Sequence, residues 1–362
     1  MSAHEILISL MAIFAALGGL DRILGNRFGL GEKFEEGILA MGSLALAMIG
    51  IISLAPVLAA VLKPVILPFF GLLGADPAMF AGTILANDMG GGSLALKLTD
   101  TYQAAMLGGV ITGSMLGATI VFIIPVAMGI LGEEDRPAMA KGILCGIVTI
   151  PLGVVAAGLV AGFPVGMVLR NVLPIVLIGT VIAIGLWKAE EAMIRGFGAF
   201  GKGVIAVITV GLVAILVKEL TGFTLIPGMA PISEGFEVVG EIAIVLAGAF
   251  PLVFVITRLL RKPLMKLGKR IGINETAAAG LIAAMANAIA TFGMVKDMDR
   301  RGKVVNIAFC VSAAFVFGDH LGFTAGFAPE MLLPMIVGKL TGGISAVVVA
   351  LWLTRERKKS PL

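Results

Sequence analysis

The stretch Gly37–Leu62, GILAMGSLALAMIGIISLAPVLAAVL, contains no charged residue. A helix that crosses the hydrocarbon core of a bilayer needs roughly 20 mostly apolar residues, so this stretch is long enough to span it. Comparable uncharged stretches cover residues 142–169 and 276–295. Because lipid offers the backbone no hydrogen-bonding partner, such stretches must be helical. The sequence therefore predicts an all-α integral membrane protein.

The overall composition points the same way. Of the 362 residues, 59% are hydrophobic and 14% are charged, and the mean hydropathy is +1.07, whereas soluble domains carry about 25% charged residues. The net charge of +4 comes from basic residues in short loops between apolar stretches. That is the pattern of cytoplasmic loops and not of a nucleic-acid-binding surface. We expect no cleavable signal peptide, because the first basic residue, Arg22, follows the apolar stretch Ile6–Leu20.

The apolar pattern predicts a polytopic helical bundle with nine membrane spans and two interrupted segments. The interrupted segments are 78–96, which contains the run NDMGGG at 87–92, and 276–295, which contains Asn287. Glycine lowers helix stability, so the run of three glycines predicts a break in the first segment. The nine spans cover residues 5–21, 37–62, 104–131, 137–163, 168–188, 203–223, 238–260, 303–328 and 331–354.

Basic residues flank segment 276–295 on both sides. Because basic loops favour the cytoplasm, we interpret this segment as a re-entrant hairpin whose two ends lie on the same side. Treating 78–96 in the same way places the N-terminus outside and the C-terminus in the cytoplasm. An ordinary arrangement of eleven spans gives the termini the same placement, so both arrangements stay open. The basic residues then left outside are Lys63, Lys97, Arg170, Lys218 and Lys339.

The two halves of the chain resemble each other. The pair Glu36-Gly37 recurs 198 residues later as Glu234-Gly235, and Gly74 recurs at the same spacing as Gly272. Four spans in each half and a single connecting helix would place the second half upside down relative to the first. Inverted repeats with broken helices that meet near the midplane are the usual architecture of secondary transporters. We therefore divide one membrane domain into a first repeat (1–164), a connecting helix (165–200) and a second repeat (201–362).

Asp88 is the first candidate for binding a substrate, because ionisable groups at membrane depth are costly and are commonly functional. It stands beside Asn87 at the predicted hairpin tip, where the glycines can leave backbone carbonyls free. A carboxylate, an amide and free carbonyls together would suit a small cation. The alternative is a shallow tip, with Asp88 hydrated and capping the second half-helix.

Asp319 and His320 are the next candidates, two thirds of the way along the predicted span 303–328. They could bind a substrate at membrane depth, or a fixed Asp–His hydrogen bond could join two helices. Asn287 could face Asn87 across the repeat axis, or it could form an ordinary polar contact between helices.

Three further residues are weaker candidates. Thr119 matches His320 if the two halves are aligned on their glycines 117 and 318. Glu36 and Glu234 head equivalent spans, where a carboxylate also suits the helix N-terminus. The sequence contains no nucleotide-binding loop and no HExxH or GxSxG motif. We therefore expect that the protein is not an enzyme and that it has no metal site and no cofactor. Coupling of transport to Na⁺ or H⁺ stays open.

Short motifs that extend through most of the chain are together specific to one family. They are FEEG (34–37), MGSLALAM (41–48), APVL (55–58), GADP (74–77), MFAGT (79–83), DMGG (88–91), ATIVF (118–122), IVTIP (147–151) and FGDHL (317–321). In these motifs the chain resembles the ethanolamine-utilisation permease family. The resemblance implies a multi-pass transporter of the bacterial inner membrane that brings in ethanolamine for enzymes housed in a protein microcompartment.

Ethanolamine would suit the candidate residues chemically. It is a primary amine, so by analogy with lysine it is mostly an ammonium at neutral pH. Asp88 or Asp319 could balance that charge, and a neighbouring amide or hydroxyl could bind the alcohol. An ion-coupled symporter of another small amine or organic solute is the alternative, followed by a membrane scaffold that transports nothing. The sequence leaves homo-oligomer formation open.

Overall fold

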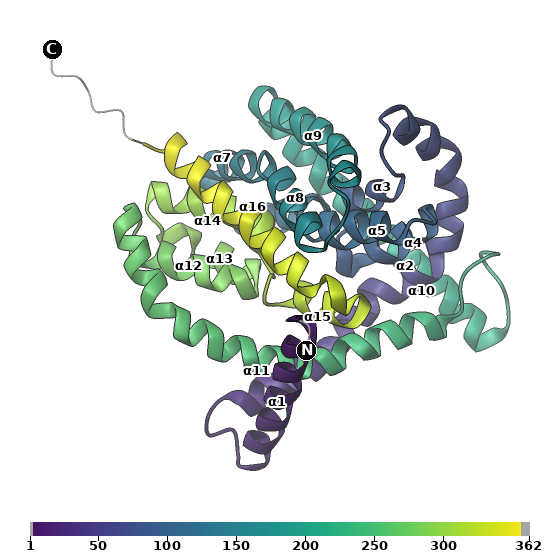
Figure 1. The fold of residues 1–362 in the computed structure, drawn as a ribbon, viewed down its shortest axis with the longest axis horizontal. Helices are drawn as coiled ribbons and strands as arrows, with labels where there is room; N and C mark the ends of the chain where they lie inside the picture. The colour runs from purple at the N-terminus through teal and green to yellow at the C-terminus, as the bar shows by residue number, and fades with distance from the viewer. Residues whose placement is uncertain (1–2, 356–362) are drawn as a thin grey trace.

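The computed structural model describes residues 3–355, which form a bundle of helices (Figure 1). Eight helical stretches in this range are long and apolar enough to cross a membrane. The prediction of an all-α polytopic membrane protein is confirmed. In chain order the elements are α1 (Ala3–Ile23), α2 (Leu30–Leu72), α3 (Ala78–Ile84), η1 (Asn87–Met89), α4 (Gly91–Leu98), α5 (Tyr102–Ala105), η2 (Met106–Gly117), η3 (Thr119–Ile123), α6 (Ile124–Ile130), η4 (Glu133–Asp135), α7 (Arg136–Ile147), α8 (Ile150–Val160), α9 (Val165–Lys188), α10 (Glu190–Thr221), α11 (Ile232–Ile271), α12 (Glu275–Ala286), α13 (Ala288–Met294), η5 (Val295–Asp297), α14 (Arg300–Ala313), α15 (Asp319–Phe327), η6 (Pro329–Met331) and α16 (Leu332–Leu353).

The longest helices, α2 and α11, extend well beyond the predicted spans 37–62 and 238–260. They contain 43 and 40 residues, and at 1.5 Å per residue each is about 60 Å long, roughly twice the hydrocarbon thickness of a bilayer. In Figure 1, α11 runs across the lower part of the view, and α1 projects below it. Its most extensive contact is with α2. Prolines inside both helices, such as Pro56 and Pro251, remove helical hydrogen bonds and allow the helices to bend.

Helix α2 begins earlier than predicted because a carboxylate from α1 caps it. Oδ2 of Asp21 accepts the backbone N–H groups of Leu30 at 2.8 Å and Gly31 at 2.9 Å. Its Oδ1 accepts the N–H of Phe28 at 3.0 Å. The first N–H groups of a helix have no acceptor within the helix, so this carboxylate satisfies them. The apolar pattern alone does not contain that information.

Two glycines bring α2 and α11 close together. A Cβ built on Gly37 of α2 would lie 2.5 Å from the backbone of Leu246, and one on Gly235 of α11 would lie 3.1 Å from Cα of Ile49. Small residues permit such close approach where membrane helices cross. Each helix therefore presents to the other one of the two glycines that the sequence pairs.

A second reciprocal contact joins each long helix to the first helix of the other half of the chain. A Cβ on Gly50 of α2 would lie 2.1 Å from the carbonyl oxygen of Ile208 in α10. A Cβ on Gly248 of α11 would lie 2.1 Å from the carbonyl oxygen of Met11 in α1. The halves of the chain are therefore interleaved.

Each interrupted segment returns to the place from which it starts. Around α3, η1 and α4, the Thr99 hydroxyl donates to Oδ2 of Asp76 at 2.8 Å. Around α12, α13 and η5, Nδ2 of Asn274 donates to the carbonyl of Asp297 at 2.9 Å. The backbone N–H of Asn274 also donates to Oδ1 of Asp299 at 2.8 Å. Both segments therefore have the geometry of a hairpin, with its two ends hydrogen-bonded together.

The prediction of one unbroken span over 303–328 is wrong. Helix α14 ends at Ala313 and α15 begins at Asp319. Between them, the N–H groups of Phe315 and Phe317 donate to the carbonyls of Ala284 (3.1 Å) and Met285 (2.8 Å). The backbone at the break is therefore satisfied by the end of α12, at the tip of the second hairpin.

The corresponding stretch of the first half, 104–131, stays helical but is wound differently. Most of it has π-helical hydrogen bonding, in η2 and η3, a geometry that often marks functional sites. A Cβ on Gly117 at the end of η2 would lie 1.9 Å from the carbonyl oxygen of Leu85, at the tip of the first hairpin. The first hairpin therefore packs on a distorted helix, as the second packs on a broken one.

Two other predicted boundaries differ from the structure. The predicted span 137–163 divides into α7 and α8 around Thr149, which lies between them and whose hydroxyl donates to the carbonyl of Gly146 at 2.8 Å. Helix α10 begins at Glu190, and only Ala189 separates it from the end of α9 at Lys188. The proposed end of the connecting helix at residue 200 therefore falls inside α10.

Candidate substrate-binding site

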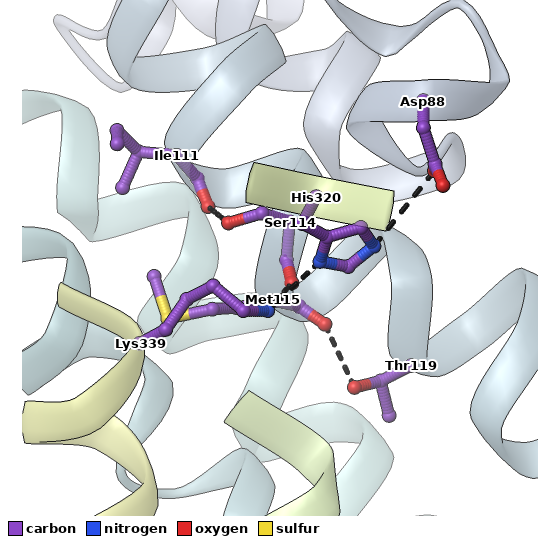
Figure 2. A network of polar contacts seen from close by, with 7 residues as sticks. All are labelled: Asp88, Ile111, Ser114, Met115, Thr119, His320 and Lys339. Atoms are coloured by element: carbon purple, nitrogen blue, oxygen red, sulfur yellow. Dashed lines mark hydrogen bonds and ion pairs between the residues drawn. The ribbon is translucent and has the colours of Figure 1, made fainter. Parts of the chain in front are cut away.

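Charged and polar side chains converge where the tip of the first hairpin meets the distorted helix η2, the half-helix α15 and helix α16. Figure 2 shows the ring of His320 between the carboxylate of Asp88 and the ammonium of Lys339. These residues are far apart in the sequence. The breaks in the hairpin and in the 303–328 crossing place Asp88 in the short 3-10 turn η1 and His320 in the first turn of α15.

The contacts form a chain from the hairpin tip into the bundle. Oδ1 of Asp88 lies 3.8 Å from Nε2 of His320, which is longer than a direct hydrogen bond. Nδ1 of His320 lies 2.9 Å from Nζ of Lys339, and Nζ donates to the backbone carbonyl of Ser114. The exposed fraction falls along the chain, from 18% for the side chain of Asp88 to 3% for His320 and 1% for Lys339.

For a charged Lys339, hydrogen-bond chemistry assigns the roles of the two nitrogens of His320. A lysine ammonium has donors and no acceptor, so Nδ1 of His320 must accept from a charged Lys339. A neutral imidazole then carries its proton on Nε2, the nitrogen nearer to Asp88. This assignment follows from the network. It makes the ring a neutral bridge between a carboxylate and an ammonium.

Asn87 lies next to Asp88 and is fully buried, with 0% of its surface exposed. Within the described structure neither Oδ1 nor Nδ2 of Asn87 has a hydrogen-bond partner. A buried polar group without a partner costs about 1–3 kcal/mol. The amide therefore keeps a donor and an acceptor unpaired, beside a residue that carries a carboxylate.

The glycines of the hairpin tip are required mainly by close packing. Gly90 has φ of 89°, and a Cβ there would lie 2.2 Å from Cγ2 of Ile51. The carbonyl of Ala86 accepts the N–H groups of Met89 and Gly91. The expectation that the tip leaves its backbone carbonyls free is therefore wrong for Ala86, whose carbonyl is bonded within the hairpin. Asn87 and Gly90 are buried, and no side chain caps α4, so the alternative in which Asp88 caps the second half-helix is wrong.

Asp319 and His320 are neighbours in sequence but differ in burial and in the side chains that they contact. Asp319 is the first residue of α15 and is partly exposed, whereas His320 is buried. His320 contacts Asp88 and Lys339, which come from other elements. The expected proximity of a carboxylate and an imidazole therefore exists, but Asp88 supplies the carboxylate instead of Asp319.

Asn287 and Thr119 have structural roles. Oδ1 of Asn287 accepts the N–H of Ile289 at 2.8 Å and so caps α13, and the residue is exposed. It makes no hydrogen bond to Asn87, whose amide has no partner. The Thr119 hydroxyl is buried and bonds to the carbonyls of Met115 at 2.7 Å and Val311 at 2.8 Å, and Figure 2 shows the first of these contacts.

The secondary candidates lie on the exposed parts of the long helices. Glu36 pairs with Lys33 and stands well inside α2, because that helix begins at Leu30. The expectation that Glu36 occupies a helix N-terminus is therefore wrong. Glu234 lies in the first turn of α11, where a carboxylate suits the helix dipole.

Lys339 is the one member of the network that the sequence interpretation placed incorrectly. It was expected outside the membrane, yet it is buried in α16. It is the only charged residue between Leu332 and Leu353. A lone lysine in the middle of an apolar span is itself a signal of function.

Discontinuous helices around a buried charged centre define a polytopic membrane protein of the kind typical of secondary transporters. Comparison with known families places the chain more closely. The family described as "Ethanolamine utilisation protein, EutH" matches residues 3–353. The chain belongs to the EutH family.

Relatives are similar over almost their whole length. A protein of Listeria monocytogenes named "Probable ethanolamine permease EutH" is 59% identical over 99% of this chain and 96% of its own. A Salmonella typhimurium protein of the same name is 48% identical, covering 98% and 96%. An uncharacterized Bacillus subtilis protein, YxeR, is 50% identical over the same shares. The names of the Listeria and Salmonella proteins describe permeases and not enzymes. No solved structure matches the chain.

Proposed function

We propose that the protein carries ethanolamine across the bacterial inner membrane, as a facilitator or secondary transporter. The names of the relatives supply the substrate. The observation that carries the proposal is the buried, unpartnered amide of Asn87 beside the carboxylate of Asp88. The ammonium of ethanolamine would lie against Asp88, and its hydroxyl would donate to and accept from Asn87.

A buried site for ethanolamine needs several polar groups, because the substrate loses its contacts with water there. Moving an ion from water into a protein interior costs several kcal/mol, and attraction to a counter-ion offsets this only with good geometry and further hydrogen bonds. A carboxylate supplies the charge, and the amide satisfies the alcohol that would otherwise be stripped of water. A site of this kind discriminates against amines that lack the hydroxyl, because they would leave the amide unpaired.

We also infer that the two halves are inverted repeats, with the N-terminus outside and the C-terminus in the cytoplasm. The reciprocal glycine contacts between α2 and α11 support this inference. So do the two hairpins, each closed by hydrogen bonds between its ends. Each hairpin would then enter from a different side of the membrane, and the substrate would bind between the repeats near the midplane.

Counterflow of labelled ethanolamine in proteoliposomes tests the proposal. Vesicles loaded with unlabelled ethanolamine should accumulate label transiently, above empty vesicles and without an imposed ion gradient. Propylamine should compete poorly, because it lacks the hydroxyl. Absence of counterflow by folded protein, or equal competition by propylamine, would count against this substrate assignment.

A further inference from the structure

A pocket of about 180 Å³ lies between the two halves of the chain, at the ends of helices. Tyr102 lines it from the start of α5, and Glu330 lines it from the 3-10 turn η6. Val160 at the end of α8 and Phe163 just after it form another part of the wall, and the remaining lining residues are apolar. Asp88 is not among the lining residues, so this pocket is separate from the candidate site.

The charge of this pocket is negative. Among the described residues that line it, Glu330 alone carries a charge. Its carboxylate accepts a hydrogen bond from the hydroxyl of Tyr102, and a carboxylate has room to accept several more. No lysine or arginine in residues 3–355 forms a salt bridge with Glu330. The pocket therefore holds a carboxylate that no ion pair within the described chain neutralises.

The end of α8 and two aromatic residues also favour a cation. In a helix the carbonyl of Val160 would accept the N–H of residue 164, but that residue is Pro164, which has no N–H. The last carbonyls of a helix also form the negative end of its dipole. Tyr102 and Phe163 contribute aromatic rings, whose faces attract ammonium ions. Together with the carboxylate, these groups suit a small organic cation.

The elements that line the pocket lead directly to the candidate site. Helix α5 continues into η2, which carries Ser114, and η6 continues into α16, which carries Lys339. Lys339 follows Glu330 by nine residues, which is about 13 Å along a helix at 1.5 Å per residue. In the proposed orientation, Tyr102 lies on the outer side, because it closely follows the closing end of the first hairpin. The pocket would then lie on the outer side of the candidate site.

We propose that this pocket binds a small alkylammonium ion against the carboxylate of Glu330 and is an outer receiving site for ethanolamine. The receiving role rests on the proposed function and orientation of the protein. The carboxylate supplies the charge, the aromatic rings contact the cation, and the carbonyl of Val160 can accept one of its N–H groups. Two sources share this chemistry: ethanolammonium in solution, and the headgroup of phosphatidylethanolamine in the outer leaflet.

Protection of a cysteine in the pocket measures its occupancy without requiring transport. Val160→Cys places a thiol at an exposed position of the lining, and the native Cys145 and Cys310 are buried. In detergent and at constant ionic strength, ethanolammonium and tetramethylammonium should slow the reaction of this thiol with a neutral methanethiosulfonate. Tetramethylammonium cannot lose its charge, so its protection reports binding of the cation itself. No protection by either ion, or equal protection by neutral ethylene glycol, would overturn the inference.

Further variants in the Val160→Cys background test the assignment to Glu330. Glu330→Gln keeps the shape and removes the charge, so the cations should protect about fivefold more weakly, as expected for an exposed charge contact. Glu133→Gln removes an exposed carboxylate elsewhere and should leave protection unchanged. Asp88→Asn alters the inner site and should also leave it unchanged. Protection that is lost in Asp88→Asn but kept in Glu330→Gln would overturn the inference. Should Glu330→Gln not fold, Tyr102→Leu removes an aromatic ring from the pocket and should weaken protection by tetramethylammonium.

Lipid nanodiscs distinguish the two sources of the ammonium ion. In discs of phosphatidylglycerol, the cysteine at position 160 should react freely until ethanolammonium is added. If phosphatidylethanolamine in the discs slows the reaction without added amine, the lipid headgroup is the occupant. Counterflow of ethanolamine without any protection of the cysteine would overturn the pocket and leave the proposed function standing. Protection without counterflow would reject the proposed function and leave the ammonium pocket standing.

Discussion

Nζ of Lys339 lies 2.9 Å from Nδ1 of His320, although both side chains are almost completely buried. The two residues belong to different helices, and the break before α15 turns His320 toward the bundle interior. On its other side the same ring faces Asp88. The ring of His320 therefore lies between the amine of Lys339 and the carboxylate of Asp88.

The first prediction concerns the carboxylate. Asp88→Asn keeps the shape of the side chain but removes the charge that would balance an ammonium, so counterflow of ethanolamine should fall at least tenfold. A single buried charge–charge contact is worth more than the 1.4 kcal/mol that a factor of ten requires. The exposed Glu133, in η4 just before α7, gives the matched control, and Glu133→Gln should retain full counterflow. Normal uptake by a folded Asp88→Asn protein would remove this carboxylate from the mechanism.

The second prediction concerns the balance of charge between Asp88 and Lys339. Asp88→Asn leaves the Lys339 ammonium uncompensated, and Lys339→Met leaves the carboxylate uncompensated, so each variant should lower the apparent melting temperature in detergent. The double variant removes both charges and should recover much of the loss, with a coupling energy of about 1 kcal/mol or more. Simple addition of the two single losses would show that the charges do not interact through His320.

The membrane class and the hairpin tip could be predicted from the sequence, because both are local. A long apolar run by itself predicts a membrane helix, and the NDMGGG run by itself predicts a break in the helix. The break in 303–328 could not be predicted, because its backbone groups bond to Ala284 and Met285 in a distant hairpin. Phe315 even adopts φ of 61°, which a bulky residue rarely does. That conformation depends on the tertiary contact and not on the local sequence.

Only part of the candidate site could be predicted from the sequence, because polar residues can be recognised locally but their contacts cannot. Asp88, Asn87 and His320 stand out as polar residues in apolar surroundings, whereas their contacts depend on how the hairpin docks. Lys339 was missed because basic residues were counted as loop markers, although its neighbours on both sides are apolar. Thr119 was chosen by alignment of the halves, yet its hydroxyl bonds to the backbone of η2 and α14.

The third prediction concerns the glycines beneath the hairpin tips. A Cβ at Gly318 would lie 2.2 Å from the carbonyl oxygen of Ala286, and one at Gly117 would lie 1.9 Å from that of Leu85. Gly318→Ala and Gly117→Ala should therefore displace a hairpin tip and destabilise the protein by about 1–3 kcal/mol or more. Gly42→Ala is the control, because a Cβ there meets nothing within 4 Å and alanine favours a helix. Wild-type melting temperatures for the two buried variants would contradict the hairpin packing.

The fourth prediction concerns the sides of the membrane on which the hairpins open. Lys97 lies in α4 two residues before Thr99, which closes the first hairpin. Lys296 lies in η5 next to Asp297, which closes the second. Both lysines are exposed. If the halves are inverted, Lys97→Cys should react with a membrane-impermeant maleimide in intact cells, and Lys296→Cys should react only after the cells are opened.

The control for this labelling is the wild-type protein, whose Cys145 and Cys310 are buried and should react little in either condition. A cysteine in place of Arg355, which follows α16, should behave like one at Lys296, because the C-terminus is expected in the cytoplasm. Labelling of positions 97 and 296 from the same side would reject the inverted arrangement. It would also place both hairpin tips on one access route, and a site between them could then not be opened alternately to the two sides.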